Sequence, residues 1–176
     1  PITIALVGCG GTGSQVLTCL ARIDHCLKTL NNPGLHVCAF DPDHVSPANI
    51  GRQLFSKSDT GLNKAVVLVS RINTFFGTAW DAIPERFDEK NGRSCNITIS
   101  CVDTLDSRKG IADSLYNYSK QYNTGSPYLQ PYYWIDFGNG KTTGQVIIGT
   151  ISDVPQPESK EYETVAMLPV FTERFQ

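Results

Sequence analysis

The chain has 176 residues, 40% of them hydrophobic, which suits one domain with a sizeable core and is too short for two comfortable ones. Its 15 basic and 17 acidic residues give a formal charge of −2, so the composition predicts neither a nucleic-acid-binding surface nor a basic membrane patch. No basic leader precedes the first apolar run and no stretch approaches the roughly 20 apolar residues that span a bilayer, which predicts a soluble, cytoplasmic protein.

The first 40 residues predict a β-α-β unit. The apolar run Ile2–Val7 suits a central parallel strand, and residues 14–30 carry apolar side chains at helical spacing. After a turn at residues 31–34, Leu35–Phe40 predicts a second strand that ends at Asp41.

The rest of the chain continues this alternation. A helix, two strands, a third helix and two strands in a hairpin-like connection are expected at residues 64–75, 80–83, 97–103, 105–122, 132–137 and 145–151. Residues 1–151 are therefore predicted to form one α/β domain, a Rossmann-like doubly wound, mostly parallel sheet with an antiparallel extension. Periodicity fades over residues 152–176, which predicts a linker or crossover loop leading to a further C-terminal part.

A glycine-rich turn separates the first strand from the first helix. Gly8, Gly10 and Gly13 fit the G-x-G-x-x-G spacing, in which missing side chains allow a tight turn, close approach of phosphate and close packing of helix on strand. The helix N-terminus that follows favours an anion. The pattern predicts a nucleotide site, and a plain glycine-rich corner is the alternative.

Polar residues after the strands indicate which nucleotide is bound. Asp41 ends a strand, where a carboxylate accepts hydrogen bonds from ribose hydroxyls. Arg52 offers a planar fork and Lys64 a point charge for phosphate, whereas Asp103 suits Mg²⁺. Singly these residues have ordinary alternatives, as a turn residue, surface charges and a cap for the next helix. Their joint order favours a site for ATP, although no lysine follows Gly13 as a P-loop requires.

This ordered set resembles the ThiF/MoeB group, relatives of the ubiquitin-activating enzymes. The resemblance spans roughly residues 1–151 and is carried by residues 8–14, Asp41-x-Asp43-x-Val45, Asn49-x-x-Arg52-Gln53, Gly61-x-x-Lys64, Cys101-x-Asp103 and the strand at Gly144-Gln145. Within the group, the sequence resembles the ThiF-like proteins of bacterial PRTRC gene clusters. The resemblance implies a homodimeric adenylyltransferase that uses ATP and Mg²⁺ to adenylate the C-terminal carboxylate of a ubiquitin-like or sulfur-carrier-like protein, releasing pyrophosphate.

The same resemblance assigns roles to individual residues. The implied nucleotide-binding residues are Gly8, Gly10, Gly11, Gly13, Asp41, Asp43, Asn49, Arg52, Gln53 and Lys64. Among them the glycines hold phosphate and adenosine, Asp41 holds the ribose and Gln53 supports Arg52. Arg52, Lys64 and Asp103 are the implied catalytic residues, with Asp103 also the Mg²⁺ ligand. Fixed cations and a metal suit this reaction because in-line attack on the α-phosphorus concentrates negative charge on the phosphate oxygens.

The sequence also departs from the group. No cysteine follows Cys101, so the usual C-x-x-C pairs are missing and no structural zinc is expected in this region. Neither a thioester cysteine after the last strand nor an arginine-bearing helix before the first is seen. We therefore expect the chain to be a fragment, or its missing parts to be supplied otherwise.

Two other functions stay open. An NAD(P)-dependent reductase would use the glycine turn and Asp41 equally well, and Tyr116 and Lys120, at i, i+4 spacing, imitate a reductase proton-donor pair. A non-catalytic partner subunit with the adenylation fold is the other alternative. Neither gives a role to Arg52, Lys64 and Asp103.

The remaining chemistry-bearing residues are expected to be structural. Most of the six cysteines are predicted to be buried thiols, and Cys9 is the one that the glycine turn exposes beside a helix N-terminus, which lowers a thiol pKa. The histidines, including His36, show no metal-ligand spacing. Trp80 and Trp134 are predicted core residues.

Overall fold

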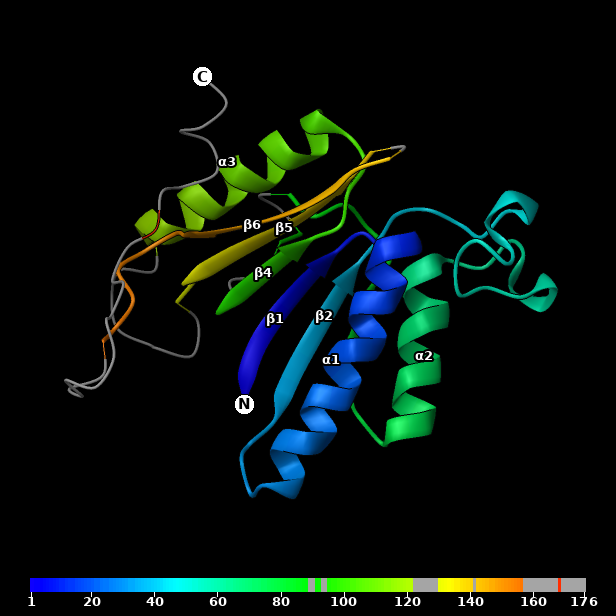
Figure 1. Ribbon diagram of the computed structural model, residues 1–176, viewed down its shortest axis with the longest axis horizontal. Coiled ribbons are helices and arrows are strands. Elements are labelled where there is room, and N and C mark those ends of the chain that lie inside the picture. Colours follow the sequence, from blue (N-terminus) through cyan, green and yellow to red (C-terminus); the bar gives the residue numbers. More distant parts are fainter. Residues whose placement is uncertain (89–90, 93–94, 122–129, 141, 157–167, 169–176) are drawn as a thin grey trace.

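The computed structural model describes residues 1–88, 91–92, 95–121, 130–140, 142–156 and 168 (Figure 1). Its elements are β1 (Ile2–Val7), α1 (Gly11–Thr29), β2 (Leu35–Phe40), η1 (Pro47–Asn49), η2 (Lys57–Asp59), α2 (Lys64–Phe76), β3 (Asp81–Ile83), β4 (Ile97–Ser100), α3 (Leu105–Gln121), β5 (Tyr133–Asn139) and β6 (Gly144–Thr150). The strands form one sheet of order β3-β2-β1-β4-β5-β6, in which only the β5–β6 pair is antiparallel. The predicted Rossmann-like fold with an antiparallel extension is confirmed.

Helices cover both faces of the sheet, because the central strands are apolar on both sides. Ile4 and Leu6 of β1 belong to the core cluster shared with α1 and α2, whereas Ala5 and Val7 belong to the cluster shared with α3. Figure 1 shows α1 and α2 side by side on one face and α3 on the other. Trp80 and Trp134 are buried, as predicted.

The order of the strands reverses between β1 and β4. β1 pairs on one side with β2 and on the other with β4. The strands that follow β1 are therefore added first on its β2 side and then on its β4 side. In doubly wound sheets, ligands bind in the crevice beyond the carboxyl ends of the strands at this point. The glycine turn follows β1 directly and therefore lies at the crevice.

Three element boundaries differ from the sequence expectation by more than one residue. α1 begins at Gly11 instead of residue 14, because the glycines themselves form its first turn after the N-cap Gly10. β4 ends at Ser100 instead of Asp103, because the chain turns to start α3 at Leu105. β5 continues to Asn139, where Gly140 N–H donates to the Thr143 carbonyl across the hairpin.

A long connection between β2 and α2, residues 41–63, carries the two short 3-10 helices and lies beside the N-terminus of α2 (Figure 1). Val45 and Phe55 are buried in the core shared with α1 and α2. Arg71 of α2 donates to the Asp59 carboxylate of η2 and to the Leu54 carbonyl. These contacts fix the connection on α2.

The C-terminal region is described only in part. Thr150, the last residue of β6, exchanges hydrogen bonds with the backbone of Leu168. Most of the predicted linker over 152–176, and Tyr122 of the predicted third helix, lie outside the described residues. In the part that is described, no helix has the length and apolar character needed to cross a membrane.

Candidate functional site

The glycine turn owes its shape to Gly8 and Gly13. Gly8 has φ +94°, and a Cβ there would lie 2.9 Å from the Cys101 carbonyl oxygen. A Cβ on Gly13 would overlap the Gly8 carbonyl oxygen. These two glycines therefore give the tight turn and the close packing of α1 on β1 that the spacing predicts.

Gly10 and Gly11 face open space instead. A Cβ on Gly11 would meet no atom within 4 Å, and one on Gly10 would meet only Gln53 Nε2 at 3.8 Å. Gly10 is the N-cap of α1 and, being a glycine, has no side chain with which to cap the helix. The first turn of this 19-residue helix therefore presents backbone N–H groups and the positive end of the helix dipole to a space that an anion can enter.

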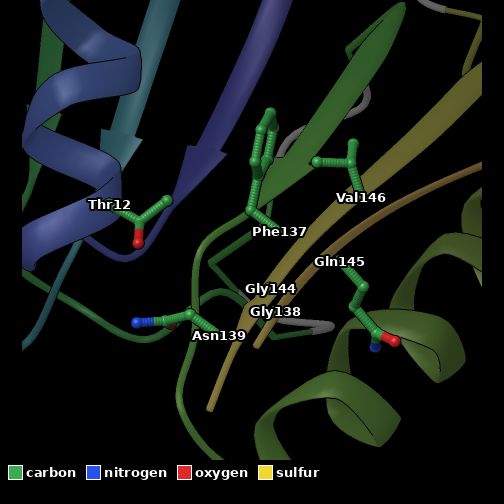
Figure 2. Close-up of a pocket in the computed structure, with 7 residues that line it drawn as sticks. All are labelled: Thr12, Phe137, Gly138, Asn139, Gly144, Gln145 and Val146. Atoms are coloured by element: carbon green, nitrogen blue, oxygen red, sulfur yellow. The ribbon is translucent and has the colours of Figure 1, made fainter. Parts of the chain in front are cut away.

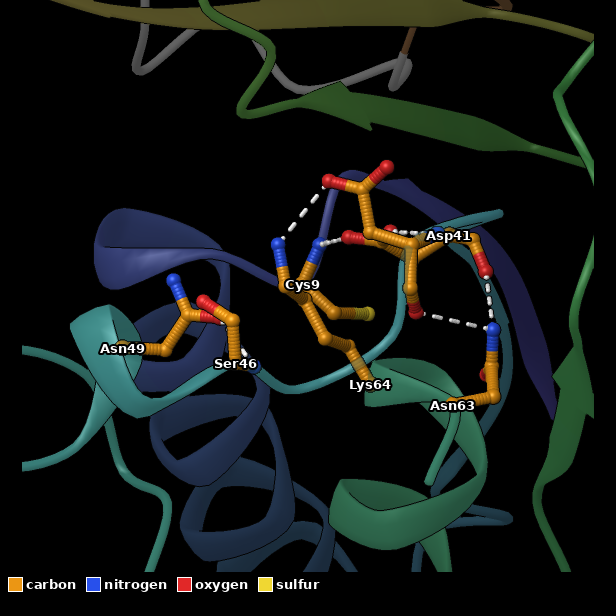
Figure 3. A network of polar contacts seen from close by, with 7 residues as sticks. Cys9, Asp41, Ser46, Asn49, Asn63 and Lys64 are labelled. Atoms are coloured by element: carbon orange, nitrogen blue, oxygen red, sulfur yellow. Dashed lines mark hydrogen bonds and ion pairs between the residues drawn. The ribbon is translucent and has the colours of Figure 1, made fainter. Parts of the chain in front are cut away.

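Asp41 joins the end of β2 to the glycine turn (Figure 3). Its Oδ2 accepts from the Cys9 backbone N–H at 2.6 Å, and its Oδ1 accepts from the Asp43 N–H at 2.8 Å. Burial raises the pKa of Asp41 above its ordinary value, and the two N–H donors oppose this rise. Each oxygen keeps a lone pair, so Asp41 can also accept from a ribose hydroxyl.

Lys64 is brought to the same place as the first residue of α2. It is only 7% exposed, and its Nζ lies 2.9 Å from Asp43 Oδ2. The neighbouring Asn63 caps α2 by accepting from Val66 N–H, and it donates to the backbone carbonyls of Asp41 and Asp43. Asn63 was missed in the sequence, although an asparagine directly before an apolar helical run is a capping signal.

The connection after β2 places the other predicted triphosphate residues. Asn49 is buried and accepts from the N–H and hydroxyl of Ser46, which shapes η1. Gln53 lies against Gly10, and its Oε1 is buried without a hydrogen-bond partner among the described residues. Arg52 is exposed at the turn between them. The support of Arg52 by Gln53 stays a prediction.

The residues that follow β4 contact the glycine turn from the β4 side of β1. Cys101 N–H donates to the Val7 carbonyl, and the Cys101 backbone contacts Gly8. Asp103, two residues later, is exposed. Thr104 Oγ1 accepts from Ser107 N–H and so caps α3. Thr104 thus takes the capping role that the sequence offered as an alternative for Asp103.

A buried ion pair behind Asp103 was missed in the sequence. Asp136 of β5 is 1% exposed and accepts from Arg108 Nε at 2.9 Å and from the Ser100 hydroxyl. Arg108 also donates to the Val102 carbonyl at 2.8 Å, directly before Asp103. The available signal was a charged residue within an apolar strand, because such a residue needs a partner.

Three separate stretches thus meet at the glycine turn. Gln53 lies against Gly10, Asp41 binds the N–H of Cys9, and Cys101 lies against Gly8. The structure brings Asp43 and Lys64 together with Asp41. Within the described ranges, no hydrogen bond or ion pair joins the side chains of Arg52, Lys64 and Asp103 to one another.

A pocket of ≈ 290 Å³ lies between Thr12 of α1 and the β5–β6 hairpin (Figure 2). A second hollow of ≈ 390 Å³ continues from the same hairpin to Arg108. The residues lining the first are Thr12, Phe137, Gly138, Asn139, Gly144, Gln145 and Val146. The start of α1 and the glycine-rich β5–β6 hairpin thus line this pocket together.

The expectations for the cysteines need correction. Cys9 is buried instead of exposed, and burial followed by the nearby Asp41 charge raises its pKa well above the ordinary value. Burial likewise raises the pKa of Cys101 to about 12. Cys19 and Cys26, by contrast, are exposed on α1. The position and pKa of Cys9 argue against a nucleophilic role.

Tyr116 and Lys120, the pair that imitates a reductase, lie on the outer side of α3. Tyr116 is 60% exposed, and Lys120 Nζ lies over its ring at 4.1 Å from the centroid. The arrangement is a surface cation–π contact. It gives the reductase interpretation no support.

Solved structures of E. coli tRNA N6-threonylcarbamoyladenosine dehydratase, TcdA, have a similar fold. One matches at a TM-score of 0.55 and 19% identity, over 77% of this chain and 51% of that chain. The complex with AMP matches at 0.56 and 19% identity, and the complex with ATP at 0.54 and 20% identity, each over 77% of this chain and 50% of that chain. The chain spans about half the length of these proteins.

Comparison with curated protein sequences gives no match. Comparison with protein families gives a match over residues 2–169 to the ThiF family. That match covers nearly the whole chain, and the chain therefore belongs to the ThiF family.

Proposed function

We propose that this chain binds MgATP at the glycine turn and adenylates a carboxylate. The observation that carries the proposal is the uncapped N-terminus of α1, open at Gly10 and Gly11, with buried Lys64 held beside it through Asp41 and Asp43. Membership of the ThiF family supports it, as do the ATP and AMP complexes of the E. coli dehydratase, which has a similar fold.

The reaction joins a carboxylate oxygen to the α-phosphorus and breaks the bond to pyrophosphate. Negative charge grows on the phosphate oxygens as this happens, and the roles of this chain's residues follow from that charge. The N–H groups of α1 hold phosphate, Lys64 exchanges its contact with Asp43 for a triphosphate oxygen, and Arg52 approaches from the loop. Asp41 accepts from the ribose.

Asp103 is the proposed Mg²⁺ ligand. Its carboxylate is exposed, its alternative role as helix cap is taken by Thr104, and hard cations prefer such oxygens. Bound Mg²⁺ neutralises charge on the phosphate oxygens. Arg108 and Asp136 fix the backbone at Val102 and so hold the position of Asp103.

The proposed acceptor is the C-terminal carboxylate of a ubiquitin-like or sulfur-carrier-like protein. The pocket between Thr12 and the β5–β6 hairpin is the proposed channel for its C-terminal residues, because it opens beside the start of α1. The formal charge of −2 favours a protein over a tRNA acceptor, since phosphate backbones attract basic surfaces. We also propose that the enzyme is a homodimer.

Pyrophosphate exchange into ATP tests the proposal. With candidate ubiquitin-like proteins added, we expect exchange that falls in Arg52→Ala, Lys64→Ala and Asp103→Ala. Lys57→Ala, an exposed lysine of the same connection, is the matched control and should keep exchange. Exchange that all three variants retain contradicts the assigned roles.

Thermal shift separates the alternative functions. MgATP is expected to raise the melting temperature, because a ligand that binds only the folded state stabilises it. A shift with NADH or NADPH alone would favour the reductase. No shift with either nucleotide would favour a non-catalytic partner subunit.

A further inference from the structure

Three side chains with different metal-binding atoms meet at the edge of the sheet away from the glycine turn. His36 and Cys38 are two positions apart on β2, and their side chains therefore point to the same face of the sheet. Asp81 begins β3, and the parallel register pairs it directly with Cys38. The strand pairing itself thus brings an imidazole, a thiol and a carboxylate together.

Their separations fit coordination of one ion. His36 Nε2 lies 3.3 Å and Cys38 Sγ 3.7 Å from the same oxygen, Asp81 Oδ2, and all three ligand atoms lie within 4.8 Å of one another. Tetrahedral zinc, with bonds of about 2.0–2.2 Å to nitrogen and oxygen and about 2.3 Å to sulfur, separates N from O by about 3.3 Å and S from O by about 3.6 Å. Only small side-chain movements are needed to seat a metal.

The surroundings allow an ion to enter. The side chains of His36 and Asp81 are 37% and 44% exposed, whereas Cys38 is buried beneath them in the core shared with α3. A metal can therefore arrive from solvent between the imidazole and the carboxylate and reach the sulfur behind them.

We propose that His36, Cys38 and Asp81 bind one Zn²⁺ ion, with the fourth position open to water or an added ligand. Thiolate and imidazole select zinc over magnesium, and three protein ligands with an open position form a coordinatively unsaturated site. Cys38 lies three residues before Asp41, about 10 Å along an extended strand, so this ion is distinct from the Mg²⁺ proposed at Asp103.

The proposal departs from two expectations drawn from the sequence, that His36 has no ligand spacing and that no structural zinc is present. Both expectations considered only the spacing of possible ligands along the chain. The third ligand comes from a paired strand 43 residues beyond Cys38, which local spacing cannot reveal. The bound ion would tie the three-residue edge strand β3 to β2.

Cobalt spectroscopy on the metal-free chain tests the proposal. Co²⁺ is expected to give a thiolate charge-transfer band and tetrahedral d–d bands that Zn²⁺ abolishes on titration. Each of His36→Ala, Cys38→Ser and Asp81→Asn should weaken metal affinity by about 100-fold or more, because even outer-shell changes cost about 10–100-fold. Zn²⁺ should raise the melting temperature of the wild type and not that of these three variants.

Controls separate this site from other thiols. His25→Ala and Cys26→Ser alter an adjacent exposed histidine and cysteine on α1 and should leave the spectrum unchanged. If Cys38→Ser does not fold, the two variants of the exposed ligands, His36→Ala and Asp81→Asn, still test the proposal. Absence of a thiolate band, or a band unaffected by both of these variants, overturns the proposal.

Discussion

The carboxylate of Asp41 accepts a hydrogen bond of 2.6 Å from the backbone N–H of Cys9. This bond fastens the end of β2 to the turn after β1. Asp41 also accepts from Asp43 N–H, and Asp43 pairs with Lys64. The glycine turn and the proposed catalytic lysine are thereby linked through Asp41 and Asp43.

The four glycines of the turn are expected to respond differently to a methyl group. Gly13→Ala should lower the free energy of unfolding by about 3 kcal/mol, because its Cβ would overlap the backbone of Gly8. Gly11→Ala should leave stability equal or higher, since its Cβ meets nothing within 4 Å, yet weaken ATP binding by occupying the proposed phosphate position. Chemical denaturation and calorimetric titration with MgATP measure both effects. Full ATP affinity in a folded Gly11→Ala variant would count against phosphate binding at α1.

Replacing the buried Lys64 tests whether its ion pair with Asp43 is catalytic or structural. Lys64→Met keeps the side-chain volume, and Asp43, whose side chain is 64% exposed, stays hydrated. Stability should therefore change by less than about 1 kcal/mol. Pyrophosphate exchange should fall by about 10²–10³-fold, the usual cost of removing one electrostatic contact to developing charge. A large loss of stability with little loss of exchange would mark Lys64 as structural.

Asp59 gives the connection before α2 a pH dependence. Its pKa is lowered chiefly by the Ser56 N–H, with the Ser56 hydroxyl and Arg71 also contributing. Because the folded pKa lies below the unfolded one, Asp59 stabilises the fold above the unfolded pKa of about 4, and this stability is lost as pH falls through the folded pKa. Asp59→Asn should thus be less stable by about 1 kcal/mol at pH 7. Denaturant midpoints should converge with those of the wild type in acid, and a gap independent of pH would contradict the assignment.

The thiols should differ in reactivity. Cys19 and Cys26 are exposed and should react first with iodoacetamide in the native protein. Cys9 and Cys101 should react only on unfolding, because burial raises the pKa of both, that of Cys101 to about 12. Mass spectrometry of labelled peptides, with denatured protein as the control, checks the order. Rapid native labelling of Cys9 would restore it as a candidate nucleophile.

The Arg108–Asp136 pair should be needed for stability. Arg108→Met leaves the charge of Asp136 buried without its ionic partner and should cost about 3 kcal/mol. Lys109→Met, at the next, exposed position of α3, is the matched control. Equal unfolding midpoints for both variants would show that the pair contributes little.

Patterns within short segments allowed most of the fold to be predicted. The apolar strands, the helical spacing and the glycine turn are local features, and the boundaries moved only where the chain had to turn, as at Ser100. The expectation that most cysteines are buried did not separate out Cys19 and Cys26, which are exposed because burial on α1 follows the face that carries Leu17, Leu20 and Asp24.

Contacts between distant segments were beyond local patterns. The sequence predicted Asp41 as a ribose ligand, but its bond to Cys9 depends on β1 and β2 being adjacent. Arg108 and Asp136 are 28 residues apart and meet only because α3 covers the strands beside it. Such pairs need the topology of the sheet as well as the spacing of residues.

A crystal structure of the chain with Mg²⁺ and a non-hydrolysable ATP analogue tests the central claim most directly. The account predicts that the triphosphate lies at the N-terminus of α1, with Lys64 Nζ and the Arg52 guanidinium on its oxygens and Asp103 at the metal. A nucleotide bound elsewhere, or a triphosphate that these three side chains do not reach, would contradict it.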